Sequence, residues 1–438
     1  MTDPPRSDRV STSGRTAAKR TGPNPIGSSG AATEPTASSG VTMARISLGK
    51  VLRPESANYF LLLGVTLFLV GLGLVMVLSS SSVDSHLDGG GYFGAFWRQA
   101  TYALIGVPLM LIVSRFPIRF WKRWAWPALL VGMFLQLLVF TPLGIETGGN
   151  RNWIEIGSFT AQPSEAVKLA LVIWLGLILT VKQERLTDWK HALIPVVPIA
   201  GLSIGFVLLG GDLGTVVIMA AIVFAALYFA GVRLRVLAIP MLGGALLFAI
   251  MAITSPNRMQ RIMSFLGDGC TDYENACWQP LHGTWALANG GIFGVGLGNS
   301  RAKWSWLPAA SNDYIFAVIG EELGLIGAVL VLGLFVFLAI MFVRIMRSTD
   351  DQFVRVTTGA VMTWIIGQAL VNIGVVLGVL PVLGVPLPLM SSGGTALLTT
   401  LIAMGIVLSF ARDRAKPVRP SARRRPARRT TTTTVGAR

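Results

Sequence analysis

The sequence predicts an all-α membrane protein, a polytopic bundle of ten transmembrane helices with one large extracytoplasmic loop. The chain is 52% hydrophobic and only 13% charged, and its mean hydropathy is +0.62. Apolar runs of about 20 residues, the length that crosses the hydrocarbon core of a bilayer, recur along the chain. Residues 1–56 are instead polar and rich in Ser, Thr, Gly and Pro, so we expect a disordered N-terminal tail.

Ten apolar segments make up the predicted membrane domain, residues 57–411. They lie near residues 58–80, 95–114, 121–141, 163–181, 191–209, 212–230, 235–254, 313–343, 354–379 and 387–411. The connection between the seventh and eighth segments, residues 255–311, is long and polar, so we expect the large external loop there. A basic, disordered C-terminal tail, residues 412–438, is expected to follow.

The lysine and arginine residues of the connections set the predicted orientation, because cytoplasmic connections are enriched in them. They gather at residues 115–123, 182–190, 233–235 and 344–355, on the side that also holds both tails. Both termini are therefore expected in the cytoplasm. The tails carry 13 of the 16 net positive charges. We interpret this charge as attraction to anionic membrane lipids or to an acidic protein partner, and we expect no nucleic-acid partner.

The predicted external loop keeps positive charge and both cysteines of the chain. Its cationic side chains are Arg258, Arg261, Arg301 and Lys303. They either hold an anionic substrate or reflect the weakness of the charge rule in long loops. Cys270 and Cys277 share the loop. Because the outside of the membrane is oxidising and no third cysteine competes, we predict a disulfide bond between them.

Polar groups inside the apolar segments are the first candidates for a site. Glu165 and Lys168 lie three residues apart, so they share a helix face and can pair. A helix N-terminus alone explains Glu165, whereas Lys168, a turn deeper, needs a carboxylate or a water-filled cavity. Asp212 can act as a helix N-cap. Asp313 can cap its helix too, or act as a single base, since Glu321 lies about 12 Å further along the axis.

Two further groups of residues stand out near the end of the membrane domain. Gln368 and Asn372 lie four residues apart and present one polar helix face. Ser391, Gly393 and Gly394 follow three prolines in an interrupted segment. Irregular backbone at membrane depth must be buried in protein or line a cavity. The three histidines are scattered without metal-ligand spacing, so no metal site is predicted.

Six motifs, taken together and in order, resemble the SEDS family of shape, elongation, division and sporulation proteins over residues 58–411. They are Gln162-Pro-Ser-Glu-x-x-Lys168, Asp212-Leu-Gly-Thr215, Gly290-Gly-x-x-Gly-x-Gly-x-Gly-Asn-Ser300, Leu307-Pro through Gly320-Glu-Glu-Leu-Gly324, Gln368-x-x-x-Asn-x-Gly374 and Leu387-Pro-Leu-Met-Ser-Ser-Gly-Gly394. The glycine run and the long basic tail resemble the division member of the family more than the elongation member.

The resemblance implies a peptidoglycan glycosyltransferase of the bacterial plasma membrane, located at the division septum. It would polymerise lipid II together with a class B penicillin-binding protein and bind other division proteins through its tails. Asp313 takes the position of the family's catalytic candidate. The residues expected to contact substrate are Glu165, Lys168, Arg151, Gln368, Asn372, Ser391, Gly393 and Gly394. The sequence departs from the family around this site, since Asn312 and Tyr314 flank Asp313, and Arg151 is offset by one position.

The implied reaction needs one base and one source of positive charge. Asp313 would accept a proton from the 4-hydroxyl of one sugar as that oxygen attacks the anomeric carbon of another lipid-linked sugar with inversion. The leaving diphosphate would be stabilised by Lys168, by loop arginines, or by a divalent cation such as magnesium or manganese. An elongation polymerase, a lipid II flippase that uses the same polar cavity, and a non-enzymatic division scaffold are the alternatives.

Overall fold

The computed structural model describes residues 56–87, 89–147, 150–157, 159–254, 256–266, 277–304 and 306–413. Nearly all of the two predicted tails lies outside the described residues, as does Cys270. The described residues belong to one compact unit.

Helices dominate the described chain and follow the predicted spans. They are α1 (Ala57–Leu87), α2 (Gly94–Val113), α3 (Ile118–Leu137), α4 (Pro163–Val181), α5 (Trp189–Leu193), α6 (Val196–Leu209), α7 (Leu213–Phe229), α8 (Leu234–Thr254), α9 (Pro256–Leu266), α10 (Trp278–Gly290), α11 (Ile315–Arg347), α12 (Gln352–Met362), α13 (Gln368–Val376) and α14 (Gly394–Asp413). The π-helical turn η4 (Thr363–Gly367) joins α12 to α13. The predicted helical membrane bundle is therefore confirmed.

The number of spans stays a prediction. Within the described residues, eight helical segments are long and apolar enough to cross a membrane. The sixth and seventh predicted spans coincide with shorter apolar helical stretches, Leu213–Phe229 and Leu234–Leu246. By length and composition alone, these two stretches do not qualify as membrane spans.

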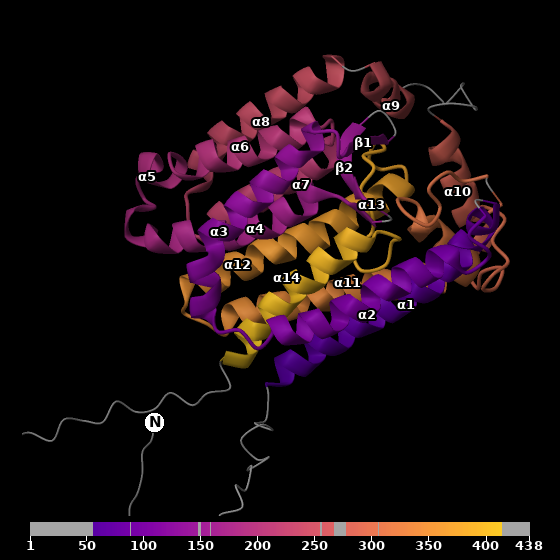
Figure 1. Cartoon of the computed structure of the whole chain (residues 1–438), viewed down its shortest axis with the longest axis horizontal. Helices are drawn as coiled ribbons and strands as arrows, with labels where there is room; N and C mark the ends of the chain where they lie inside the picture. Colours follow the sequence, from indigo (N-terminus) through magenta and orange to yellow (C-terminus); the bar gives the residue numbers. More distant parts are fainter. Residues whose placement is uncertain are drawn as a thin grey trace, which may run out of the picture. The chain divides into compact units, whose positions relative to one another are not determined.

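The helices pack so that α4, α12 and α14 form the interior of the bundle. Helix α4 packs against α3, α7 and α12, and α14 packs against α2. Helix α1 lies beside α2 and α11 (Figure 1). About two thirds of the apolar windows of α4 and α14 are buried, against about a third for α11. Polar side chains on α4, α13 and α14 are therefore shielded from lipid by their neighbours.

A small antiparallel sheet stands in the connection between α3 and α4, where the sequence predicted no strands. Its strands are β1 (Gly144–Thr147), β2 (Asn150–Ile156) and β3 (Phe159–Ala161), in the order β1-β2-β3. In β2 the exposure alternates, with Asn152 and Ile154 buried and Arg151 and Glu155 exposed, as a half-buried strand requires. The all-α prediction missed this sheet because strands of three to seven residues are too short to show a clear period.

Non-helical backbone interrupts the eighth and the tenth predicted spans. Gly324 has φ 69° inside α11, so the helix is kinked there. An added Cβ on Gly290, Gly294 or Gly324 would overlap backbone atoms of the facing segment, which shows how closely the end of α10 approaches the kink. The last span begins as irregular backbone, and its helix α14 starts only at Gly394. That interruption confirms the interpretation of the proline-rich segment.

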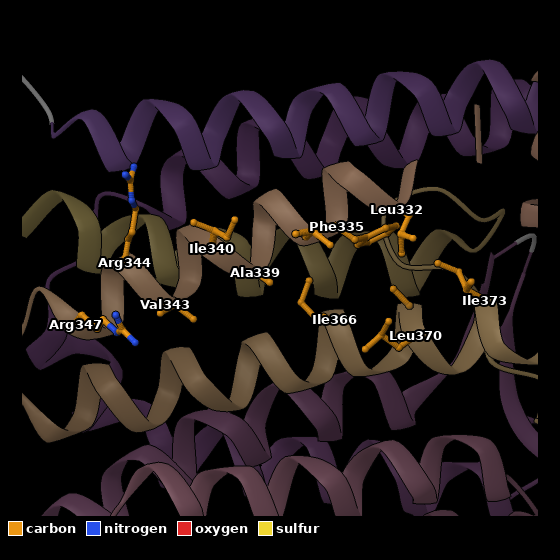
Figure 2. Close-up of a pocket in the computed structure, with 12 residues that line it drawn as sticks. Leu332, Phe335, Ala339, Ile340, Val343, Arg344, Arg347, Ile366, Leu370 and Ile373 are labelled. Atoms are coloured by element: carbon orange, nitrogen blue, oxygen red, sulfur yellow. The ribbon is translucent and has the colours of Figure 1, made fainter. Parts of the chain in front are cut away.

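An apolar groove of about 500 Å³ lies between α11 and the segment formed by η4 and α13. Leu332, Phe335, Ile366 and Leu370 line it, and two arginines, at positions 344 and 347, stand at one end (Figure 2). Apart from these two guanidinium groups, its lining is hydrocarbon. The groove therefore lacks the carboxylate and amide groups that sugar chemistry requires, and the candidate site must lie elsewhere.

Candidate functional site

The interior of the bundle holds a buried ion pair. Glu165 lies in the first turn of α4, and Lys168 lies one turn later. Lys168 Nζ is 2.7 Å from Glu165 Oε1, and the two residues are only 1% and 3% exposed. A single buried charge would be costly, so each residue makes the burial of the other possible. The predicted pairing is confirmed.

The lysine has partners from a second helix. Lys168 Nζ donates a hydrogen bond to Gln368 Oε1 at 3.3 Å and lies 5.2 Å from the centre of the Trp364 ring. Trp364 Nε1 donates to the same Gln368 oxygen at 3.2 Å. Trp364 stands in the π-helical turn, a local widening of the helix that is frequent at functional sites. The other oxygen of Glu165 accepts from Thr399 Oγ1 on α14 at 3.3 Å.

Asp313 lies just before the start of α11, outside the helical span, and is half-buried. Burial raises the pKa of its carboxyl to about 6, while the positive charge of Arg261 acts in the opposite direction and the negative charge of Asp212 adds to the rise. An added Cβ on Gly384 would lie 3.7 Å from Asp313 Oδ2, so the carboxylate faces the irregular segment before α14. A carboxylate with this pKa is suited to general base catalysis near neutral pH.

The backbone around Asp313 is fixed by the irregular segment and by α13. Asn372 Nδ2 donates to the carbonyl oxygens of Asp313, at 2.7 Å, and Val385, at 2.8 Å. Ser391 Oγ donates to the carbonyl oxygen of Asn312 at 2.6 Å. Gln368, one turn before Asn372, donates through Nε2 to the carbonyl oxygen of Pro386, which follows Val385 in the irregular segment, at 2.8 Å. One polar face of α13 therefore joins the Lys168 cluster to Asp313.

Asp212 also belongs to this region, although the sequence suggested only a cap. Its Oδ1 accepts from the backbone N–H of Thr215 at 2.9 Å, which confirms the capping role at the start of α7. Its Oδ2 accepts from Gln162 Nε2 at 2.9 Å and from Asn152 Nδ2 at 3.4 Å. Asp212 thus connects the sheet, α4 and α7 close to Asp313. The sequence signal for this role was the position of Asp212 in the motif Asp212-Leu-Gly-Thr215.

Other predicted substrate contacts have structural partners. The exposed guanidinium of Arg151 donates to the carbonyl oxygen of Thr141 at 2.8 Å, and no described hydrogen bond joins it to Asp313 or Lys168. The backbone N–H of Gly393 donates to Gln99 Oε1 at 3.1 Å. A Cβ on Gly394 would overlap the Tyr102 ring. The two glycines therefore allow the start of α14 to pack closely against α2. Contact of Gly393, Gly394 and Arg151 with substrate stays a prediction.

The disulfide partner of Cys277 and the divalent cation both stay predictions. Cys277 takes part in a disulfide bond, and its predicted partner Cys270 lies outside the described residues, so the pairing stays a prediction. Within the described part of the chain, no group of three or more His, Cys, Asp or Glu residues is placed to hold a metal ion.

Comparisons with known proteins agree with this architecture. The family model FTSW_RODA_SPOVE, described as a cell cycle protein, matches residues 59–416. The chain is 36% identical to the probable peptidoglycan glycosyltransferase FtsW of Mycobacterium tuberculosis over 411 residues, which cover 94% of this chain and 78% of the relative. It is 34% identical to the stage V sporulation protein E of Bacillus subtilis, over 80% of this chain and 96% of the relative.

Two solved structures are similar as well. One is a chain of a peptidoglycan synthase complex that coordinates polymerization and crosslinking, with a TM-score of 0.66 at 26% identity, covering 81% of this chain and 97% of that one. The other is the rod shape determining protein RodA of Thermus thermophilus, with a TM-score of 0.59 at 25% identity and the same two coverages.

Proposed function

Because the chain belongs to the FtsW, RodA and SpoVE family of cell cycle proteins, we propose that it is a peptidoglycan glycosyltransferase that polymerises lipid II during septal wall synthesis. The observation that carries the chemistry is the half-buried carboxylate of Asp313, whose backbone is hydrogen-bonded by the same face of α13 that binds Lys168. This connection supports a base and a cation that act in one site.

Asp313 acts as the general base. Its carboxylate accepts the proton of the acceptor 4-hydroxyl while that oxygen forms a bond to the donor anomeric carbon. The bond from that carbon to the diphosphate oxygen breaks on the opposite face, so an α-linked donor gives a β-1,4 linkage. Inversion requires only this one carboxylate, and no glycosyl-enzyme intermediate forms.

The departing diphosphate is stabilised by positive charge. Lys168 is the candidate within the bundle, where low dielectric strengthens its interaction with an anion. Besides its ion pair with Glu165, the Lys168 ammonium donates a hydrogen bond to Gln368. A phosphate oxygen can replace Gln368 as the acceptor of that hydrogen bond. A divalent cation such as magnesium or manganese would neutralise the same charge, although no group of three or more His, Cys, Asp or Glu in the described residues is placed to hold one.

The partner and the setting follow from the relatives. The similar chain in a peptidoglycan synthase complex supports a class B penicillin-binding protein as the crosslinking partner. The FtsW name of the relatives supports a division role, whereas the RodA likeness supports elongation as the alternative. The tails are assigned to other division proteins and to anionic lipids. We propose that the protein lies in the bacterial plasma membrane at the septum, with both termini in the cytoplasm.

Purified full-length protein in lipid nanodiscs, given lipid II alone and then with its penicillin-binding partner, tests the proposal. A polymerase converts lipid II into glycan chains of different lengths, which separate as a ladder on a gel. In a parallel experiment with proteoliposomes, a flippase moves labelled lipid II across the bilayer without forming polymer. Translocation without polymer, or neither activity with the partner present, contradicts the proposal.

A further inference from the structure

A second cavity, of about 530 Å³, lies at α10 and differs in character from the apolar groove. Helix α10 contributes His282, Trp285 and Asn289, and the loop after it contributes Arg301, Trp304 and Trp306. None of these residues takes part in the proposed chemistry at Asp313.

The cavity combines exposed indole rings with hydrogen-bonding groups. Trp285, Trp304 and Trp306 are 53%, 63% and 57% exposed, so their rings are accessible to a ligand. The guanidinium of Arg301 and the amide of Asn289 stand among them. Flat ring faces that stack on the C–H faces of a sugar, beside groups that bind its hydroxyls, are the features that a saccharide site requires.

The cavity wall is fixed in position by a buried carboxylate. Glu321, only 1% exposed, accepts hydrogen bonds from Asn289 Nδ2 at 2.9 Å and from the backbone N–H of Arg301 at 3.1 Å. Its other oxygen accepts from the backbone N–H of Ala302 at 3.3 Å and from Ser300 Oγ. Four donors from α10 and the loop therefore meet on one residue of α11. These hydrogen bonds explain how a carboxylate is buried there although no described residue forms an ion pair with it.

His282 is held among the aromatic rings. Its ring stacks on Trp278 with centroids 4.3 Å apart, and it meets the edge of Trp285 at 4.9 Å. Nδ1 lies 2.8 Å from the carbonyl oxygen of Trp278, which can only accept, so Nδ1 carries the hydrogen. In the neutral ring Nε2 is then an acceptor, which suits a sugar hydroxyl.

The cavity is joined to the catalytic region through α10. An added Cβ on Gly283 would lie 2.7 Å from the Tyr314 ring, and Tyr314 follows Asp313 directly. Glu321 lies eight residues beyond Asp313, roughly 12 Å along the helix axis. A glycan chain with one end at Asp313 can therefore reach the cavity with its next sugars.

We propose that this cavity is a saccharide subsite that holds the glycan chain while its end reacts at Asp313. The inference rests on the proposed polymerase function. A belt of aromatic residues at the membrane interface would also account for exposed tryptophans. It does not account for the guanidinium and amide groups among them, or for the hydrogen bonds by which Glu321 holds the loop in place.

Binding of a lipid-free tetrasaccharide of alternating GlcNAc and MurNAc tests the subsite without chemistry. The full-length protein in nanodiscs is titrated with this probe by calorimetry. Trp304→Ala and Arg301→Gln should each weaken binding about tenfold, as expected for removing a central aromatic or guanidinium contact. Trp97→Ala, which removes a tryptophan that is 65% exposed on α2, should bind as the wild type does. A thermal melt of each variant confirms its fold.

The glycan products give an independent readout. With lipid II as substrate, Trp304→Ala should make shorter chains than the wild type and Trp97→Ala do, because the chain is released sooner. Failure of the wild type to bind the tetrasaccharide, or equal binding by all variants, overturns the subsite while leaving polymerisation by Asp313 intact. If Trp304→Ala and Trp97→Ala both reduce membrane insertion and neither changes saccharide binding, the tryptophans are anchors and the inference is wrong. Tetrasaccharide binding without any polymer contradicts the proposed function instead.

Discussion

Asn372 Nδ2 lies 2.7 Å from the carbonyl oxygen of Asp313, so the backbone that carries the candidate base is bound to α13. One turn earlier on the same helix, Gln368 binds Lys168. The base and the buried cation are therefore positioned by a single helix face. A change on that face should affect both the geometry and the stability of the site.

Asn372→Ala tests this coupling. The substitution removes the hydrogen bonds to the carbonyl oxygens of Asp313 and Val385, and we expect it to lower the free energy of unfolding by about 1–3 kcal/mol. Polymer formation should fall more than stability does, because Asp313 loses its fixed position. Thermal melts and initial rates in nanodiscs measure the two effects. Asn299→Ala, at an exposed site, is the control, and equal activity of the two variants would exclude the coupling.

Lys168→Ala should destabilise the bundle and abolish activity. Removal of the cation leaves Glu165 buried without its partner, which typically costs about 3–5 kcal/mol. Glu165→Ala together with Lys168→Ala should recover much of the stability but not the activity, since the diphosphate still lacks its cation. Lys168→Arg should rescue poorly, because a planar guanidinium does not replace a compact ammonium. Full activity of the double variant would show that Lys168 has only a structural role.

The raised pKa of Asp313 predicts the acid limb of the pH–rate profile. Burial raises this pKa from 3.8 to about 6, so kcat/KM should fall tenfold per pH unit below about 6, where the base becomes protonated. The folded state binds this proton more tightly than the unfolded chain does, so the contribution of this carboxyl to stability decreases as the pH rises from about 4 to 6. A rate that is flat down to pH 4.5 would contradict this assignment.

The Cys270–Cys277 bridge is the prediction for the external loop. A loop of this length gains roughly 2–3 kcal/mol from a disulfide in the chain-entropy model. Cys270→Ser with Cys277→Ser should insert normally and lose part of its activity or of its response to the partner, because the bridge orders the start of α10 and not the bundle. Mass spectrometry of non-reduced peptides from intact cells decides the bond. Two free thiols would disprove it.

The sequence predicted the bundle and the pair of Glu165 and Lys168, because long apolar runs and helical spacing are local signals. It did not predict the kink at Gly324 or the β-sheet, which depend on contacts between segments far apart in the chain. The cavity at α10 was missed for a related reason. Trp285 and Trp304 lie in different segments, and Glu321 brings those segments together only in the folded chain.

Asp313→Asn tests the central claim most directly. The amide has nearly the shape of the carboxylate but cannot accept the proton, while the hydrogen bond from Asn372 to the backbone remains. The purified variant in nanodiscs, with the penicillin-binding partner and labelled lipid II, is compared with the wild type and with Asp350→Asn, an exposed control. We predict that Asp313→Asn melts at or above the wild-type temperature and forms no glycan ladder, while the control forms a normal one. A ladder of near wild-type intensity from Asp313→Asn would contradict the account.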